Sequence, residues 1–226
     1  MAQQEKPQSF KDHDFFPPFR ECPGELVWDD RYFTDSDPDP NVPQGGATKR
    51  KHWCLLGAII QTDTFICSRV VAQDYTGHKF VVAFYPNDQN DMPRLLENFK
   101  VGNTIAVFYP LVHNFLDGRI GVRVEETDEV LIIPLGISDV IKMNEQVIEY
   151  TPGKGNPRKC HGCDEVKQGL NMCASCTIFY YCNKDCQTKA WCEKDHKKHC
   201  KVLKDENIRY MNFLKYSSYA GSVSFR

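Results

Sequence analysis

The alternation of apolar and polar positions predicts a run of β-strands in the middle of the chain. Stretches dominated by β-branched and aromatic residues, such as 80–85 (FVVAFY), are separated by turn signals such as Thr76-Gly77 and Asp117-Gly118. The predicted strands cover residues 52–61, 64–73, 78–85, 103–112 and 119–134, the last interrupted near Thr127.

A short helix is predicted between the third and fourth strands, at residues 92–99. Leu95, Leu96 and Phe99 have helical spacing there, and Gly102 provides a stop signal. Three strands, a helix and two more strands follow the order of an OB-type barrel. The predicted fold class is therefore α+β: a small, mostly antiparallel, OB-like β-barrel, followed by a cysteine-rich module with short helices.

The predicted domain organisation has five parts. Residues 1–51 form an irregular segment rich in Pro and Asp, in which we expect the aromatic part, 15–33, to dock and 35–48 to form a surface loop. Residues 52–150 form the β-rich domain, with a short helix at 137–141. Residues 151–159 are a linker, and 160–200 are the cysteine-rich module. Residues 201–226 form a helix and a tail, which we expect to be frayed from Ser217.

Seven cysteines and one histidine in the cysteine-rich module have the spacing of two interleaved zinc sites. They are Cys160, Cys163, Cys173, Cys176, Cys182, Cys186, His196 and Cys200. A structural zinc ion takes four thiolate or imidazole ligands in a closed tetrahedron, so eight ligands predict two Zn²⁺ ions. A secreted disulfide framework is disfavoured, because no apolar stretch follows Met1 and the total of 11 cysteines is odd.

The spacing also predicts how the ligands pair. Each C-x2-C knuckle turns two thiolates toward one ion, and Gly162 inside the first knuckle is expected to take a positive φ. Residues four apart share a helix face, so the last two ligand pairs should lie at or within short helices. We expect Cys160 and Cys163 to join Cys182 and Cys186, and Cys173 and Cys176 to join His196 and Cys200.

The motif at residues 181–187 (YCNKDCQ), followed by Trp191, His196 and Cys200, resembles the MYND zinc finger. The stretch before His196 looks two residues longer than is usual in that family. The resemblance implies a protein partner, a short proline-containing peptide, bound in a shallow groove to which Gln187 and Trp191 contribute. A Trp ring suits an extended proline-rich segment. The alternative for Trp191 is packing in the small core between the zinc ions.

The longer stretch introduces Cys192 and His199 as competing ligands. His196 is preferred because it keeps the x3 spacing to Cys200. On this interpretation Cys192 is a small buried residue, whereas His161 and His199 are solvated neighbours of the ligands.

The charge distribution favours protein partners over nucleic acid. Residues 1–150 carry 14 Lys and Arg against 23 Asp and Glu, and residues 151–206 carry 11 against 7. Phosphate binding requires a strongly basic face, which neither region clearly supplies. The predicted function is therefore a zinc-binding protein–protein interaction module. Nucleic-acid binding through aromatic residues of the OB-like domain is the alternative.

No enzymatic activity is expected, because the sequence contains no P-loop, G-x-S-x-G or Rossmann fingerprint. No run of 18 apolar residues is present, so neither a transmembrane helix nor a membrane partner is expected. Reduced thiols that hold zinc predict an intracellular protein, without separating nucleus from cytoplasm.

Overall fold

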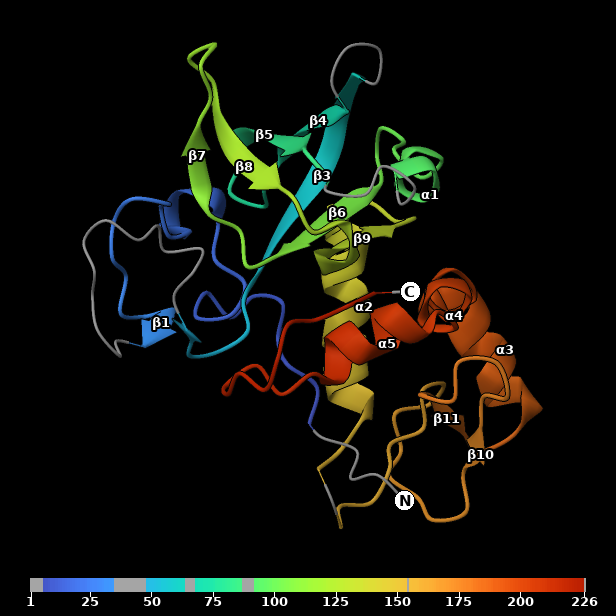
Figure 1. Ribbon diagram of the computed structural model, residues 1–226. Coiled ribbons are helices and arrows are strands. Elements are labelled where there is room, and N and C mark those ends of the chain that lie inside the picture. Colours follow the sequence, from blue (N-terminus) through green and yellow to red (C-terminus); the bar gives the residue numbers. More distant parts are fainter. Residues whose placement is uncertain (1–5, 35–47, 64–67, 87–91, 154, 226) are drawn as a thin grey trace. The chain divides into compact units, whose positions relative to one another are not determined.

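The computed structural model describes residues 6–34, 48–63, 68–86, 92–153 and 155–225 (Figure 1). The chain divides into two compact units. The first, called here the sheet unit, comprises Lys11–Ser138 and Tyr216–Arg226, and the second, the finger unit, comprises Met1–Phe10 and Asp139–Lys215. This division differs from the predicted one, because residues 139–150 group with the cysteine-rich segment and not with the β-rich domain.

The sheet unit contains one large mixed sheet. Its strands are β3 (Cys54–Asp63), β4 (Arg69–Gln73), β5 (Lys79–Phe84), β6 (Thr104–Phe108), β7 (Val112–Asn114), β8 (Ile120–Val124) and β9 (Val130–Ile133). The order is β7-β8-β5-β4-β3-β6-β9. Neighbours are antiparallel except β5 and β8, which run parallel. Within the described ranges no ladder joins β7 to β9, so the sheet is open where the sequence predicted a closed barrel.

Several predicted elements are divided or shortened in the structure. The predicted strand at 103–112 is shortened to β6, and only its last residue belongs to β7. The strand at 119–134 is interrupted at Thr127–Glu129 by a 3-10 turn, η4, as predicted. Helix α1 (Met92–Leu96) is shorter than predicted. Short strands β1 (Phe33–Thr34) and β2 (Thr48–Lys49) pair with each other. The predicted loop residues 35–47 and strand residues 64–67 lie outside the described residues.

The core of the sheet unit is built from alternating strand residues together with the aromatic N-terminal segment. Its buried members include Leu55, Ile59, Val70, Ala72, Phe80, Val82, Ile105, Val107 and Val122. Phe19 begins the 3-10 helix η1 (Phe19–Glu21) and stacks on Phe80, with ring centroids 4.8 Å apart. The expectation that residues 15–33 dock is therefore confirmed for Phe19, which fills part of this core.

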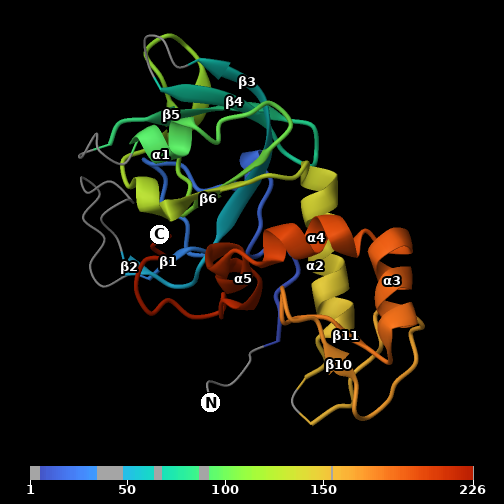
Figure 2. The same ribbon diagram turned by 90° about the vertical axis from the view of Figure 1, so that its right-hand side faces the viewer.

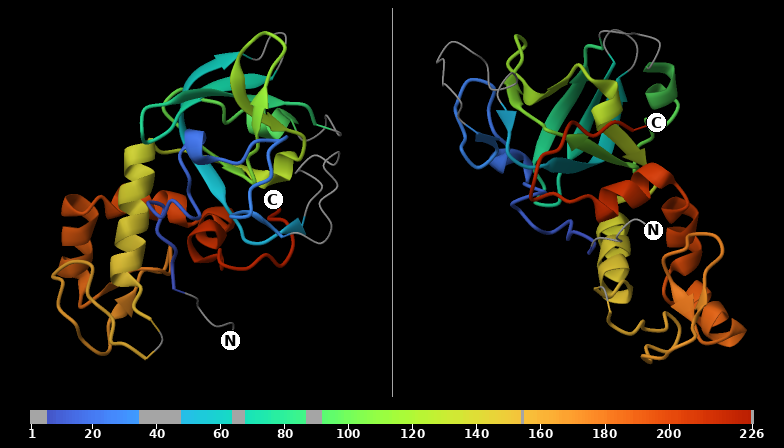
Figure 3. Two further views of the ribbon diagram at one scale, coloured as in Figure 1. Left: turned by 90° about the vertical axis from the view of Figure 1, so that its left-hand side faces the viewer. Right: turned by 60° about the horizontal axis from the view of Figure 1, so that its bottom comes forward.

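The C-terminal tail belongs to the sheet unit (Figure 3). The backbone N–H of His52 donates to the Tyr216 carbonyl at 2.9 Å, and the N–H of Phe225 donates to the Asp128 carbonyl at 2.8 Å. The side chains of Tyr216, Val223 and Phe225 are buried. The expectation of a frayed tail is wrong, because two aromatic rings and a valine anchor it.

The finger unit is built from helices and one small hairpin (Figure 2). Its elements are α2 (Ile137–Tyr150), β10 (Asn171–Met172), β11 (Tyr180–Tyr181), α3 (Lys184–Glu193), α4 (His196–Leu203) and α5 (Glu206–Phe213). Helix α2 is much longer than the predicted 137–141, and it buries Val140, Met143, Val147 and Tyr150 on one face. In the described part of the chain, every helix is too short or too polar to cross a lipid bilayer.

Candidate metal centres

The structure brings the eight predicted ligands together in two groups of four. The first group is Cys160, Cys163, Cys182 and Cys186, and the second is Cys173, Cys176, His196 and Cys200. These are the groups that the interleaved pairing predicts. Within each group the ligand atoms all lie within 4.8 Å of one another.

The sulfur–sulfur distances suit tetrahedral zinc. Zn–S bonds of about 2.3 Å in a tetrahedron place two sulfurs about 3.8 Å apart. The Sγ atoms of Cys163 and Cys182 are 3.6 Å apart in the first group, and those of Cys173 and Cys200 are 3.8 Å apart in the second. Each group therefore fits one zinc ion.

Each C-x2-C knuckle is closed by a residue with left-handed backbone geometry. Asp164, with φ 66°, directly follows Cys163, and Thr177, with φ 58°, directly follows Cys176. The Sγ atom of Cys160 accepts the backbone N–H of Cys182 at 3.4 Å. The turn geometry and this amide help to orient the thiolates toward a common point.

Gly162 is required for space rather than for its backbone angle. It is absent from the positive-φ glycines of the described chain, so the expectation of a positive φ is wrong. A Cβ atom at this position would lie 2.3 Å from the carbonyl oxygen of Cys186. The glycine lets the first knuckle approach the start of α3, where Cys186 supplies its thiolate.

The electrostatics of the first group favour a thiolate. Burial raises the pKa of the Cys160 thiol, but the backbone N–H groups of Cys163, Cys182 and Gly162 outweigh it and lower the pKa to about 6. In the second group, a hydrogen bond with Cys176 lowers the pKa of Cys200 to about 3 and raises that of Cys176. Thiolate is the form that binds metal, so these hydrogen bonds favour the ligand form of Cys160 and Cys200.

Two helices present the remaining ligands. The Asn183 side chain caps α3 by accepting the backbone N–H of Cys186 at 3.0 Å, which fixes that ligand in the first turn. His196 and Cys200 lie four residues apart on α4 and so share one face. His196 is fully buried, and neither ring nitrogen has a hydrogen-bond partner among the described residues. His161 also lacks a partner, so the deciding observation is that a ring nitrogen of His196 lies within 4.8 Å of the three Sγ atoms of its group.

The competing ligands lie outside both groups. Cys192 is exposed on α3, so the interpretation as a buried residue is wrong. His161 and His199 are fully buried, so the interpretation as solvated neighbours is also wrong. The ring of His161 stacks on Phe179 at a centroid distance of 4.0 Å, and Nδ1 of His199 lies 3.0 Å from Gln146 Oε1. Both histidines are packing residues.

Helix α2 contributes contacts that sequence reasoning missed. The Tyr150 hydroxyl hydrogen-bonds Asp164, and Lys194 Nζ lies 2.7 Å from the same carboxylate. Lys142 of α2 forms an ion pair with Asp195 at 2.6 Å. The helical spacing of Val140, Met143, Val147 and Tyr150 was the signal that could have revealed the full length of α2.

The two predicted peptide-binding residues lie on α3. Gln187 and Trp191 are four residues apart and share a helix face, and both are exposed. Trp191 has 39% of its surface exposed, and its ring centroid is 5.6 Å from that of His196. The indole is therefore partly supported by a predicted zinc ligand and partly open to solvent.

Comparison with known proteins identifies this segment. Residues 160–200 match the family model described as MYND finger. This segment is a MYND finger. It binds zinc, and its two Cys/His groups fit two zinc ions. MYND fingers are protein-interaction modules, so the chain contains a zinc-binding module of that class.

Curated relatives share the MYND finger. A SET and MYND domain-containing protein of Dictyostelium discoideum is 56% identical over 39 residues, which are 17% of this chain and 7% of that protein. SET domain and MYND-type zinc finger protein 6 of Schizosaccharomyces pombe is 43% identical over 94 residues, 42% of this chain and 18% of that protein. The chain spans less than a fifth of either relative.

Among solved structures, the Stn1-ten1 complex of S. pombe matches 39% of this chain and 62% of its own, with 16% identity and a TM-score of 0.30. A TM-score of this size does not establish a shared fold.

Proposed function

We propose that the MYND finger binds short proline-containing peptides on the face of α3 that carries Gln187 and Trp191. The observation that supports this most directly is the exposure of Trp191, 39% for a side chain as large and apolar as indole. Exposed aromatic residues with one supported face are typical anchors of peptide-binding surfaces. Gln187, one helical turn away, offers an amide that can both donate to and accept from a peptide backbone.

Zinc has a structural role in this proposal. The ions hold the ligands in place and with them the two helices that carry Cys186, His196 and Cys200. Trp191 contacts the His196 ring, so the position of the indole depends on the second group of ligands. The finger residues then orient the peptide, with its prolines against the indole and its backbone near the Gln187 amide.

The test is a binding measurement with the full chain and a panel of short proline-containing peptides. Trp191→Ala should abolish binding while the protein keeps two zinc ions by elemental analysis. Lys189→Ala, at an exposed position of the same helix, is the matched control and should bind normally. Unchanged peptide binding by Trp191→Ala would refute the proposed site.

We further propose that the chain acts by binding inside the cell and not as an enzyme. Each group of zinc ligands has four members, which leaves no coordination position for a substrate. The names of the two relatives include a SET domain, but the matched segments cover only 7% and 18% of them. A methyltransferase assay with histone and peptide substrates is the direct test, and turnover would contradict the proposal.

We also propose that the sheet is a partly open OB-type barrel. Strands β6-β3-β4-β5-β8 are consecutive in the sheet, with α1 between β5 and β6 in the chain. Strands β3, β4 and β5 form a meander, and the later strands β6 and β8 pair with its two edge strands, β3 and β5. This connectivity is consistent with a Greek-key barrel of that type.

A second candidate function, binding of single-stranded nucleic acid, is favoured by one cavity of the sheet unit. It has a volume of about 540 Å³ and contains Arg69, Arg119 and Arg123. Tyr85, 45% exposed, also lines it and lies under the Arg123 guanidinium at 4.8 Å. Arginines beside an exposed aromatic ring suit a stacked base and its phosphate. Each of these arginines has an acidic partner, which weakens the positive field: Asp117 lies 3.5 Å from both Arg69 and Arg119, and Glu125 lies 2.8 Å from Arg123.

Fluorescence anisotropy with a labelled oligothymidine distinguishes the two functions. A nucleic-acid site would give binding that weakens steeply with salt, and that Tyr85→Ala and Arg123→Gln reduce. Trp191→Ala should leave this binding unchanged. No binding at low salt would exclude the second candidate and leave the peptide proposal untouched.

A further inference from the structure

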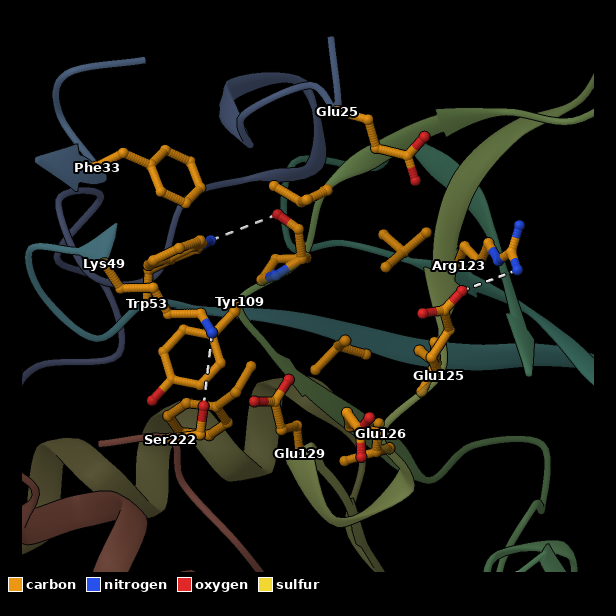
Figure 4. A pocket seen from close by; sticks show the side chains of 17 residues that line it. Glu25, Phe33, Lys49, Trp53, Tyr109, Arg123, Glu125, Glu126, Glu129 and Ser222 are labelled. Atoms are coloured by element: carbon orange, nitrogen blue, oxygen red, sulfur yellow. Dashed lines mark hydrogen bonds and ion pairs between the residues drawn. The ribbon is translucent and has the colours of Figure 1, made fainter. Parts of the chain in front are cut away.

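A further cavity of the sheet unit is lined by residues of β6, β8 and β9 together with residues of the N-terminal segment and the tail (Figure 4). Its volume is about 610 Å³, within the range of small-ligand sites. Val107 of β6 and Val122 and Val124 of β8 supply aliphatic surface, and Val130 of β9 adds to it. These four valines are core residues with 1–5% of their surface exposed, and they form an apolar floor of the cavity.

Aromatic rings at one end of the cavity are held in fixed positions. The Trp53 indole N–H donates to the Pro110 carbonyl at 3.4 Å. The Tyr109 hydroxyl contacts His52 Nδ1 at 2.5 Å and accepts the backbone N–H of Val223 at 3.1 Å. Because the hydroxyl is engaged on both sides, the Tyr109 ring cannot swing away from the cavity.

The charges that line the cavity are mostly negative. Four glutamates face one lysine and one arginine: Glu25, Glu125, Glu126 and Glu129 against Lys49 and Arg123. Arg123 pairs with Glu125 at 2.8 Å, and His113 pairs with Glu25 at 2.6 Å. Figure 4 shows the Glu129 carboxylate at the same end as Tyr109 and Ser222. Glu129 is therefore the carboxylate that lies beside the aromatic end.

Two further observations describe the charges at this end. Burial raises the pKa of Glu129 to about 7, and the positive charge of nearby Lys49 acts to lower it. The Lys49 ammonium lies 4.4 Å from the centroid of the Tyr109 ring and 3.5 Å from Ser222 Oγ. An ammonium over an aromatic face is an attractive cation–π contact. Lys49 thus shows, within the chain itself, how a cation is accommodated here.

We propose that this cavity binds a basic side chain, arginine or lysine, of a partner polypeptide. The aliphatic stem would lie along the valine side, and the cationic head would lie between Glu129 and the Tyr109 ring. Long basic side chains have this combination of an apolar stem and a charged end. The site is distinct from the α3 face of the finger and does not depend on the peptide-binding proposal.

The probe for this proposal is Nα-acetyl-arginine amide, titrated into the full chain with its valine methyl groups isotopically labelled for NMR. We expect saturable shifts of Val107, Val122, Val124 and Val130. Nα-acetyl-citrulline amide has nearly the same shape without the charge and should cause none of them. Trp191→Ala should bind the probe as the wild type does.

Two variants test the charges. Glu129→Gln should weaken binding about tenfold, the equivalent of one charge-assisted hydrogen bond. Lys49→Gln removes the resident cation and should strengthen it. Glu97→Gln, an exposed position outside the cavity, is the control and should bind unchanged. Absence of valine shifts up to the solubility limit of the probe, or equal binding of the citrulline analogue to the wild type, would overturn the proposal without bearing on the finger.

Discussion

Gln146 of α2 hydrogen-bonds His199 of α4, with 3.0 Å between Gln146 Oε1 and the Nδ1 atom of the histidine. The amide nitrogen of the same glutamine donates to the carbonyl of Lys194, the C-cap of α3, at 3.1 Å. One side chain thus connects both ligand-bearing helices of the MYND finger to α2. Helix α2 is consequently part of the folded finger unit, and the metal centres depend on residues outside the zinc motif.

Gln146→Ala should destabilise the finger unit by about 1–3 kcal/mol, because it leaves the buried His199 ring and the Lys194 carbonyl without partners. The measurement is the rate of zinc release to a chelator, which should rise. Ser138→Ala, at an exposed position near the start of α2, should release zinc at the wild-type rate. A wild-type rate for Gln146→Ala would show that α2 does not support the metal centres.

Gly162→Ala should disrupt the first zinc site, because the added methyl group would lie 2.3 Å from the Cys186 carbonyl oxygen. We expect the variant to bind one zinc ion instead of two, as measured by elemental analysis. Gly153→Ala is the matched control, since a methyl group there meets only ordinary van der Waals contact at 3.8 Å. Two zinc ions retained by Gly162→Ala would contradict the close approach of the knuckle to α3.

Tyr216→Ala should destabilise the sheet unit by about 3–5 kcal/mol, the usual cost of deleting a buried aromatic ring. The ring is 1% exposed and packs against Phe16 with 4.9 Å between centroids. Urea unfolding followed by tryptophan fluorescence measures the loss, in a Trp191→Phe background that removes the signal from the finger. Ser218→Ala, also in the tail but exposed, should leave the unfolding midpoint unchanged.

Glu129 should make the sheet unit less stable as the pH rises. Burial raises its pKa from 4.5 to about 7 in the folded state. Below the unfolded pKa both states are protonated, so the carboxyl has no effect. Between 4.5 and about 7 the unfolded state loses its proton first, and the free energy of unfolding falls by no more than about 3 kcal/mol.

The pH effect is tested by urea unfolding in the same Trp191→Phe background at about pH 5 and about pH 8, below and above most of this window. Glu129→Gln should remove most of the difference between the two values, and its gain in stability should appear only at the higher pH. A difference of wild-type size in Glu129→Gln would assign the pH dependence to another group.

The zinc groups could be predicted from sequence because their ligands are fixed by local spacing. The C-x2-C knuckles and the His196-x3-Cys200 pair each determine their own geometry within a turn or one helical repeat. The strand positions could be predicted for the same reason, because the alternation of apolar and polar residues is a local signal. The buried state of His161 depends instead on Phe179 and Tyr150, which approach it only in the folded unit.

The open sheet and the anchored tail depend on long-range contacts of the same kind. Phe225 packs against Phe108 with 5.4 Å between ring centroids, a contact between residues more than one hundred positions apart. Serine, alanine and glycine dominate the residues that follow Ser217, and they give no local sign of it. The role of Gln146 was hidden because a lone glutamine in a helix is most often solvated, and its two partners lie on helices that only the zinc ligands bring into place.

The two groups of four ligands should each hold one zinc ion, which is measured by elemental analysis of the purified chain with a parallel thiol count. The wild type should contain two zinc ions per chain. Cys176→Ser should contain one, with the circular dichroism of the sheet unit preserved because that unit has its own core. One zinc ion in the wild type, or two in Cys176→Ser, would contradict the assignment.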